Sequence, residues 1–275
     1  MSLDPFDYKE PACPLGGGKE FYDFESNRQE GSIPIRNVIE KLDGYLNRED
    51  YVGADRLLKY WLEEARSLKD RKGELSILSE IMGFSRRIKD ADGGLAAVWR
   101  GFELVEELPL DDKTAGTILL NGATTLKAFG KAKEAVRYYE KARDCYGNIL
   151  ADYDPLWGGF YNNYALALSD LERYDEALDH YQNAIDIMAQ KEYGGLEIAV
   201  TLMNVAELFE RMGENDALIE QSLEQAFAYL DDPQLPQNGY YAFVCRKCAP
   251  TFGHFGWFMT EKDLNERANR IYEGS

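Results

Sequence analysis

Apolar residues recur along most of the chain at intervals of three and four positions, which is the spacing of amphipathic helices. The clearest stretch spans residues 161–188 and divides at a short polar turn, residues 171–174. Its first part places one face of a helix at Tyr161, Tyr164, Ala165 and Leu168. Its second part does the same at Ala177, Leu178, Tyr181, Ala184, Ile185 and Met188. The pattern predicts two antiparallel helices joined by a turn, an αα-hairpin.

The hairpin pattern repeats about every 41 residues. Well-preserved copies begin at Asn121, Asn163 and Asn204, and a small residue follows each asparagine two positions later. Small residues where helices cross let the helices approach closely and make room for the next hairpin. Because one repeat cannot bury its apolar face alone, the period predicts a stack of hairpins whose function is binding along one surface.

These positions resemble the signature of the tetratricopeptide repeat. That signature has a bulky and then a small residue in the first helix, and a small, an aromatic and a second small residue in the second helix. One copy fills these roles with Tyr161, Ala165, Ala177, Tyr181 and Ala184, the copy before it with Leu119, Ala123, Ala135, Tyr139 and Ala142, and the copy after it with Ala206, Gly213 and Ala226. The period exceeds the usual 34 residues, and the chain in this respect resembles the long-repeat type found in kinesin light chains and related bacterial proteins.

The resemblance implies an all-α fold, a right-handed superhelical solenoid of about six hairpins that occupies residues 32–275. More degenerate hairpins flank the central three, with small residues at Gly83, Gly94, Gly101, Ala249, Gly256 and Ala268. Residues 1–31 contain several prolines and a run of three glycines and have no helical period. We expect this segment to be an irregular or disordered leader.

In the family, the first helix of each hairpin lines the concave side, so the resemblance implies a ligand-binding groove made of first-helix residues that the spine does not use. The candidates are Leu120, Asn121, Thr124, Lys127, Asn162, Asn163, Leu166, Met203, Asn204, Glu207 and Arg211. An amide offers donors and an acceptor, so a row of asparagines can hold the main chain of an extended peptide. In the long-repeat relatives such a row contacts peptides, which implies this role for Asn121, Asn163 and Asn204. The alternative is that these side chains cap or bridge neighbouring helices.

Apolar contact with the peptide is expected from Leu120, Leu166 and Met203. A rival use of the groove is a carboxylate clamp that holds the C-terminal acid of a chaperone tail. The available cations are Lys127, Arg211, Arg246 and Lys247. They are scattered and interleaved with acidic residues, which disfavours a clamp.

The chain is strongly acidic, with a formal net charge of −18 over 275 residues. Such a surplus repels nucleic-acid phosphates and anionic membranes and favours basic or neutral protein partners. The sequence contains no apolar run of about 20 residues, the length of a membrane span, and its acidic start does not resemble a signal peptide. We therefore expect a cytoplasmic protein.

Candidate catalytic chemistry is sparse. Cys245 and Cys248 form a C-x-x-C pair, but a closed zinc site needs four ligands and no second cysteine pair exists. Both cysteines also coincide with apolar spine positions, which favours packing. His180 and His254 are the only histidines, and the glycine-rich residues 14–20 lack the spacing of a phosphate loop. The sequence therefore predicts no enzyme activity, no cofactor and no metal site.

The sequence favours a protein or peptide interaction module, and a peptide-responsive signalling receptor or regulator that uses the array as its sensor is the alternative. Aromatic residues gather near the end of the chain at Tyr240, Tyr241, Phe252, Phe255, Trp257 and Phe258. This cluster either seals the exposed edge of the last hairpin or docks a partner or a second copy of the chain, so a homo-oligomer is possible.

Overall fold

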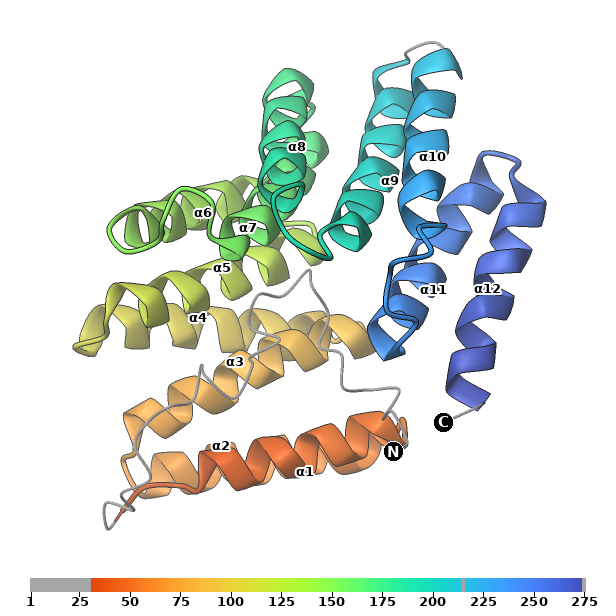
Figure 1. The fold of residues 1–275 in the computed structure, drawn as a ribbon. Coiled ribbons are helices and arrows are strands. Elements are labelled where there is room, and N and C mark those ends of the chain that lie inside the picture. The colour runs from red at the N-terminus through yellow and green to blue at the C-terminus, as the bar shows by residue number, and fades with distance from the viewer. Residues whose placement is uncertain (1–30, 214–215, 274–275) are drawn as a thin grey trace. The chain divides into compact units, whose positions relative to one another are not determined.

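The computed structural model describes residues 31–213 and 216–273 (Figure 1). The described ranges contain twelve α-helices and no strand, which confirms the predicted all-α fold of helical hairpins. Except for Gly31, the expected leader at residues 1–31 lies outside the described residues.

The described residues divide into two compact units, each with three hairpins. The N-terminal unit, residues 31–151, contains α1 (Ile35–Asn47), α2 (Tyr51–Ser67), α3 (Arg71–Ile88), α4 (Ala91–Glu107), α5 (Asp112–Ala128) and α6 (Ala132–Gly147). The C-terminal unit starts at residue 152 and contains α7 (Pro155–Asp170), α8 (Tyr174–Met188), α9 (Gly195–Met212), α10 (Asp216–Leu230), α11 (Gly239–His254) and α12 (Phe258–Glu273). We call the odd-numbered helices A helices and the even-numbered ones B helices.

Most of the small residues that the sequence assigned to the spine are buried, but Gly213 and Gly256 are exposed and lie in the turns that follow α9 and α11. Ala123 and Ala135 in the N-terminal unit are fully buried, and so are Ala165 and Ala206 in the C-terminal unit. The aromatic spine residues Tyr139 and Tyr181 occupy corresponding places in α6 and α8, and both are fully buried or nearly so. The alternation of small and large side chains lets successive helices interlock at close range.

Three turns of the N-terminal unit use the same two-residue device, a left-handed residue followed by an aspartate N-cap. Glu49, Lys69 and Lys89 adopt φ angles of 55°, 57° and 60°. The aspartate after each of them accepts a hydrogen bond from the backbone N–H of a glycine three positions on, at the start of α2, α3 and α4. The cap satisfies an otherwise orphan donor of the helix and is worth about 1 kcal/mol. Short turns of this kind hold neighbouring helices antiparallel.

A buried carboxylate ties three helices of the N-terminal unit together. The side chain of Glu74 on α3 is 7% exposed and accepts hydrogen bonds from Arg66 on α2 and from Arg100 on α4, at 3.2 and 3.1 Å. Burial by itself raises the pKa of Glu74, but the hydrogen bonds from Arg100 and Arg66 outweigh it, and the net pKa is lowered. The ionised form is therefore the one that the fold stabilises.

Successive hairpins within a unit are in contact through their A helices. An A helix touches the A helix of the next hairpin, as α3 touches α5 and α9 touches α11, and α2, α4 and α8 also touch the A helix that follows them. The A helices thus form a continuous layer within each unit.

Candidate functional site

Asn121 lies on α5 and is almost completely buried. Its Nδ2 donates to the carbonyl oxygen of Ser79 on α3 at 2.9 Å and contacts the Ser79 Oγ at 3.1 Å. Its Oδ1 accepts a hydrogen bond of 2.8 Å from Arg86 Nη1, also on α3. Both ends of this amide therefore join two neighbouring A helices of the N-terminal unit, which is the bridging role that the sequence left open as an alternative.

The other candidates in this unit are Leu120, Thr124 and Lys127. Leu120 is fully buried and belongs to the core, so it offers no surface to a ligand. Thr124 donates from its Oγ1 to the Leu120 carbonyl at 2.9 Å, and its hydroxyl shares a hydrogen bond with that of Tyr139. Lys127 is half-buried near the end of α5. The prediction that Leu120 contacts a peptide is therefore wrong, because its side chain is buried between the helices.

In the C-terminal unit, the asparagines lie on α7 and α9. Asn162 and Asn163 are buried, whereas Asn204 is half-buried. Asn204 Nδ2 donates to Asn162 Oδ1 at 2.9 Å, across 42 residues of sequence, which is the same offset as in the bond between Asn121 and Ser79. Among the described residues, the Oδ1 and the second N–H of Asn204 have no other partner. Asn204 is therefore the one asparagine of the row that combines exposure with free hydrogen-bonding capacity.

Further polar contacts join the A helices of the C-terminal unit. Arg211 Nη1 on α9 donates to Asp170 Oδ1 on α7 at 3.0 Å, and this bond to Asp170 is the main reason that the pKa of Arg211 is raised. Glu207 on α9 accepts a 3.0 Å hydrogen bond from Thr251 Oγ1 on α11. We call the contacts of Asn162–Asn204, Asp170–Arg211, Glu207–Thr251 and Glu210–His254 the A-helix ladder.

The last rung of the ladder joins His254 on α11 to Glu210 on α9. The Nε2 atom of His254 lies 2.8 Å from one carboxylate oxygen of Glu210 and 3.0 Å from the other. Both side chains are about half exposed, so water screens the pair and its contribution to stability is small.

The ladder includes four of the residues that the sequence offered as candidates, Asn162 on α7 and Asn204, Glu207 and Arg211 on the adjoining A helix α9. Leu166 is half-buried on α7, whereas Met203 is buried in the core of the unit and gives no open apolar contact. Sequence reasoning missed Ser79, the partner of Asn121 in the N-terminal unit, and the ladder partners Thr251 and His254. The signal that could have found them is a polar residue 42 to 44 positions from another polar residue on the equivalent helix face.

The cysteine pair is packed inside α11. Cys245 and Cys248 are buried, and burial raises the pKa of their thiols to about 11 and about 12. Thiols with such pKa values remain protonated near neutral pH and are poor nucleophiles and metal ligands. Within the described residues there is no group of three His, Cys, Asp or Glu side chains that could hold a metal ion. This arrangement supports spine packing as the role of the pair.

Most of the terminal aromatic residues face the core. Tyr241 and Phe252 are buried, and Tyr240, Phe255 and Trp257 pack against the core of the C-terminal unit. Phe258 is the exception, with 68% of its surface exposed at the start of α12. None of the helices in the described ranges has both the length and the apolar character of a membrane span.

Comparison with known proteins agrees with the repeat pattern. The tetratricopeptide-repeat family model matches residues 159–231, and no curated protein matches the chain in sequence. A solved structure of a Podosopora anserina putative kinesin light chain with nearly identical TPR-like repeats is 14% identical, with a TM-score of 0.51 over 71% of this chain and 93% of that one. A STAND signal transduction ATPase with a tetratricopeptide repeat sensor, from Pyrococcus horikoshii, is 15% identical, with a TM-score of 0.54 over 90% of this chain and 37% of that one.

Stacked αα-hairpins with small residues at their crossings define a helical-repeat scaffold of the kind that mediates protein interactions. Within that class, residues 159–231 match the tetratricopeptide repeat, and the fold of the chain is similar to that of a kinesin-light-chain structure.

Proposed function

We propose that this protein binds an extended segment of a partner protein along the A helices of its C-terminal unit. The observation that carries the proposal is the free hydrogen-bonding capacity of Asn204 within the A-helix ladder. A peptide main chain needs both a donor and an acceptor at each contact, and an amide supplies both. Half-buried Leu166 on the neighbouring A helix would add apolar contact.

Two neighbours of Asn204 on α9 would set the preferred ligand. Glu207 and Arg211 already have partners inside the ladder, yet both retain exposed surface. Residues 152–273 contain 22 acidic and 8 basic side chains, so the field around this face favours a ligand of net positive charge. In this proposal Asn121 and Asn163 stabilise the stack and Asn204 is the contact residue.

The test starts from peptides selected for binding to the full chain from a random 12-residue library, with their affinity measured by fluorescence anisotropy. Asn204→Ala should weaken binding about 5- to 10-fold, because a net hydrogen bond contributes about 1 kcal/mol and 1.4 kcal/mol is a factor of ten. Gln225→Ala is the matched control, since Gln225 is an exposed amide on the B helix α10. Equal affinities for Asn204→Ala and Gln225→Ala would contradict the proposal.

A second candidate function is a sensor that changes shape when a peptide binds. It is favoured by the likeness in fold to the STAND protein whose printed description includes a tetratricopeptide repeat sensor, of which this chain covers 37%. A sensor should contract when the selected peptide is added, which small-angle X-ray scattering would detect as a smaller radius of gyration. An unchanged radius would leave a passive interaction module as the function.

A further inference from the structure

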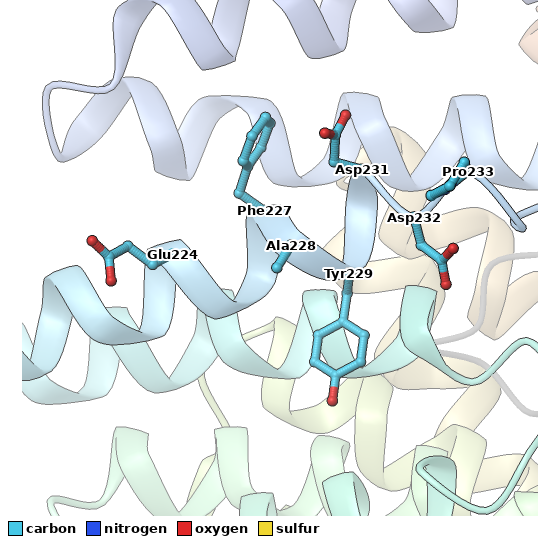
Figure 2. Close-up of a pocket in the computed structure, with 7 residues that line it drawn as sticks. All are labelled: Glu224, Phe227, Ala228, Tyr229, Asp231, Asp232 and Pro233. Atoms are coloured by element: carbon cyan, nitrogen blue, oxygen red, sulfur yellow. The ribbon is translucent and has the colours of Figure 1, made fainter.

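The outer side of the C-terminal unit carries a hollow at the end of α10, apart from the A-helix ladder. The hollow has a volume of about 490 Å³. It is lined by Glu224, Phe227, Ala228, Tyr229, Asp231, Asp232 and Pro233 (Figure 2). Pockets of about 300 Å³ or more can enclose a ligand group, so this volume suffices for a long side chain of a partner.

Part of the arrangement of the hollow follows from helical spacing. Glu224 and Ala228 are four positions apart, which places them along one face of α10, and Asp232 lies two residues beyond the end of the helix at Leu230. Figure 2 shows Ala228 in the middle, with Glu224 on one side of it along the chain and Asp232 on the other. Phe227 and Tyr229 project to opposite sides of the same helix. The small side chain of Ala228 thus leaves a space with acidic groups at its ends and aromatic rings at its sides.

The electrostatics of the hollow are unusual for the end of a helix. The C-terminal end of a helix carries a partial negative charge and is normally accompanied by basic side chains. The last turn of α10 contains no basic residue, and the carboxylates of Asp231 and Asp232 follow directly after it. The negative charge at this helix end would therefore be stabilised by a cation from another part of the chain or from a ligand.

One carboxylate of the hollow, that of Asp231, already has a basic partner within the chain. Arg267 on α12 donates to Asp231 Oδ1 at 2.7 Å, and its guanidinium carbon lies 5.9 Å from the ring centroid of Phe227. This contact shows that a guanidinium suits the combination of carboxylate and ring that lines the hollow. Arg267 also pairs with Asp263 at 2.7 Å, and among the carboxylates of the hollow it bonds to Asp231 alone.

Two carboxylates remain without a cation. Asp232 accepts a 2.9 Å hydrogen bond from the backbone N–H of Gln234 and forms no ion pair among the described residues. Glu224 has neither a hydrogen-bond partner nor an ionic partner within the described ranges. The ring of Tyr229 is 38% exposed beside them. Asp232 and Tyr229 thus offer an exposed carboxylate and an exposed ring, the same two kinds of group that Arg267 contacts at Asp231 and Phe227.

We propose that this hollow is a docking site for an arginine side chain in a basic segment of a partner protein. The guanidinium would lie over Ala228, stack on the exposed ring of Tyr229 and bond to Asp232, and Glu224 would add a negative charge on the other side of Ala228. Arginine suits the site better than lysine, because its planar group stacks on aromatic rings and meets carboxylates in a two-pronged geometry. The site lies on a B helix and does not depend on peptide binding to the A helices.

The experiment uses two synthetic peptides, one of three Gly-Arg repeats and one of three Gly-Gln repeats, each titrated into the full-length ¹⁵N-labelled protein at 150 mM salt. The arginine peptide should shift the amide signals of Ala228 and Tyr229 in a saturable way, and the glutamine peptide should not. A double variant, Glu224→Gln with Asp232→Asn, should weaken this binding at least 5-fold. Its matched control is Asp175→Asn with Asp179→Asn, which removes two exposed charges from α8 of the same unit and should change affinity less than 2-fold.

A variant that fills the hollow distinguishes binding inside the hollow from general electrostatic attraction to the acidic surface. Ala228→Leu leaves the charge unchanged and occupies the hollow, and it should also weaken binding at least 5-fold. Circular dichroism melting checks that each variant is folded, and Tyr229→Leu serves as a second probe of the stacking contact. Equal losses in the two double variants, undiminished binding to Ala228→Leu, or signal shifts spread over the acidic surface without a maximum at Ala228 would each overturn the proposal.

Discussion

The two units contain the same number of hairpins but treat charge in opposite ways. Residues 31–151 contain 20 basic and 20 acidic side chains, whereas residues 152–273 contain 8 basic and 22 acidic ones. The N-terminal unit contains a buried carboxylate, that of Glu74, which is paired with Arg66 and Arg100. In the C-terminal unit much of the acidic surplus lies at the surface of α8 and α10.

This difference separates what the fold requires from what it leaves free. Both units build their hairpins on the same alternation of alanine and aromatic side chains, which are buried in each of them. The fold does not depend on net charge, because the same hairpins form in a unit with a net charge of zero and in a unit with a large negative net charge. The acidic surplus is therefore available for recognition, and we locate both proposed binding surfaces in the unit that carries it.

The largest expected effect tests whether the two spines are equivalent. Tyr139→Ala and Tyr181→Ala remove fully or almost fully buried rings at corresponding positions of α6 and α8. Each change should lower the free energy of unfolding of its own unit by about 3 to 5 kcal/mol, the range for deleting a large aromatic side chain from a core. Denaturant titration with hydrogen exchange of each unit would measure this. A loss below about 1 kcal/mol in either unit would show that the spines are not equivalent.

The second prediction concerns the buried charge of the N-terminal unit. Glu74→Gln should destabilise that unit by about 1 to 3 kcal/mol, because it leaves two arginines without their shared carboxylate. The pKa of Glu74 is lowered in the folded chain, so its stabilisation is present above the unfolded pKa of about 4.3 and is lost as the pH falls through the folded value. Unfolding of wild type and variant between pH 2 and pH 7 measures the effect, and Glu103→Gln is the exposed control. Parallel pH profiles would contradict it.

The smallest expected effect has the opposite sign and belongs to the C-terminal unit. Burial raises the pKa of Glu197 on α9, although a hydrogen bond with Tyr240 and the charge of Lys247 oppose the shift. Because the folded chain holds this proton more tightly, Glu197 lowers stability as the pH rises above its unfolded pKa of about 4.3. Glu197→Gln should therefore stabilise the unit at pH 7 by up to about 1 kcal/mol.

The measurement for Glu197 is the difference in unfolding free energy between variant and wild type at pH 4 and at pH 7. The gain should be larger at pH 7, and Glu210→Gln, at a half-exposed rung of the ladder, provides the comparison. A gain that is independent of pH would remove ionisation as its cause. Together with Glu74, this experiment contrasts a carboxylate that the fold stabilises with one that it penalises.

The hairpins could be predicted from the sequence because a period of three and four is a local property. The alanines at residues 123, 165 and 206 mark where helices cross, and each is buried as expected. The candidate site was harder, because adjacent positions of a helix point about 100° apart and the packing of the next A helix decides which of them stay open. Leu120 and Met203 became core residues for this reason, and Asn121 became a bridge.

The hollow around Ala228 illustrates the remaining limit. Its acidic residues can be read from the sequence, but the space itself exists only because a small side chain stands between two larger ones at the end of α10. The difference in charge between the two units, by contrast, can be counted in the sequence alone. It becomes informative once the boundary at residue 151 is known.

Helix α9 also fixes the order in which hairpins can follow one another. It meets α7 through Asn204 and Arg211, and it meets α11 through Glu207 and Glu210. Because its two flanks carry different side chains, neighbours exchanged by recombination would face donors and acceptors that do not match. A family that grows by duplicating hairpins thus acquires, through such polar contacts, a fixed sequence of modules in place of interchangeable ones.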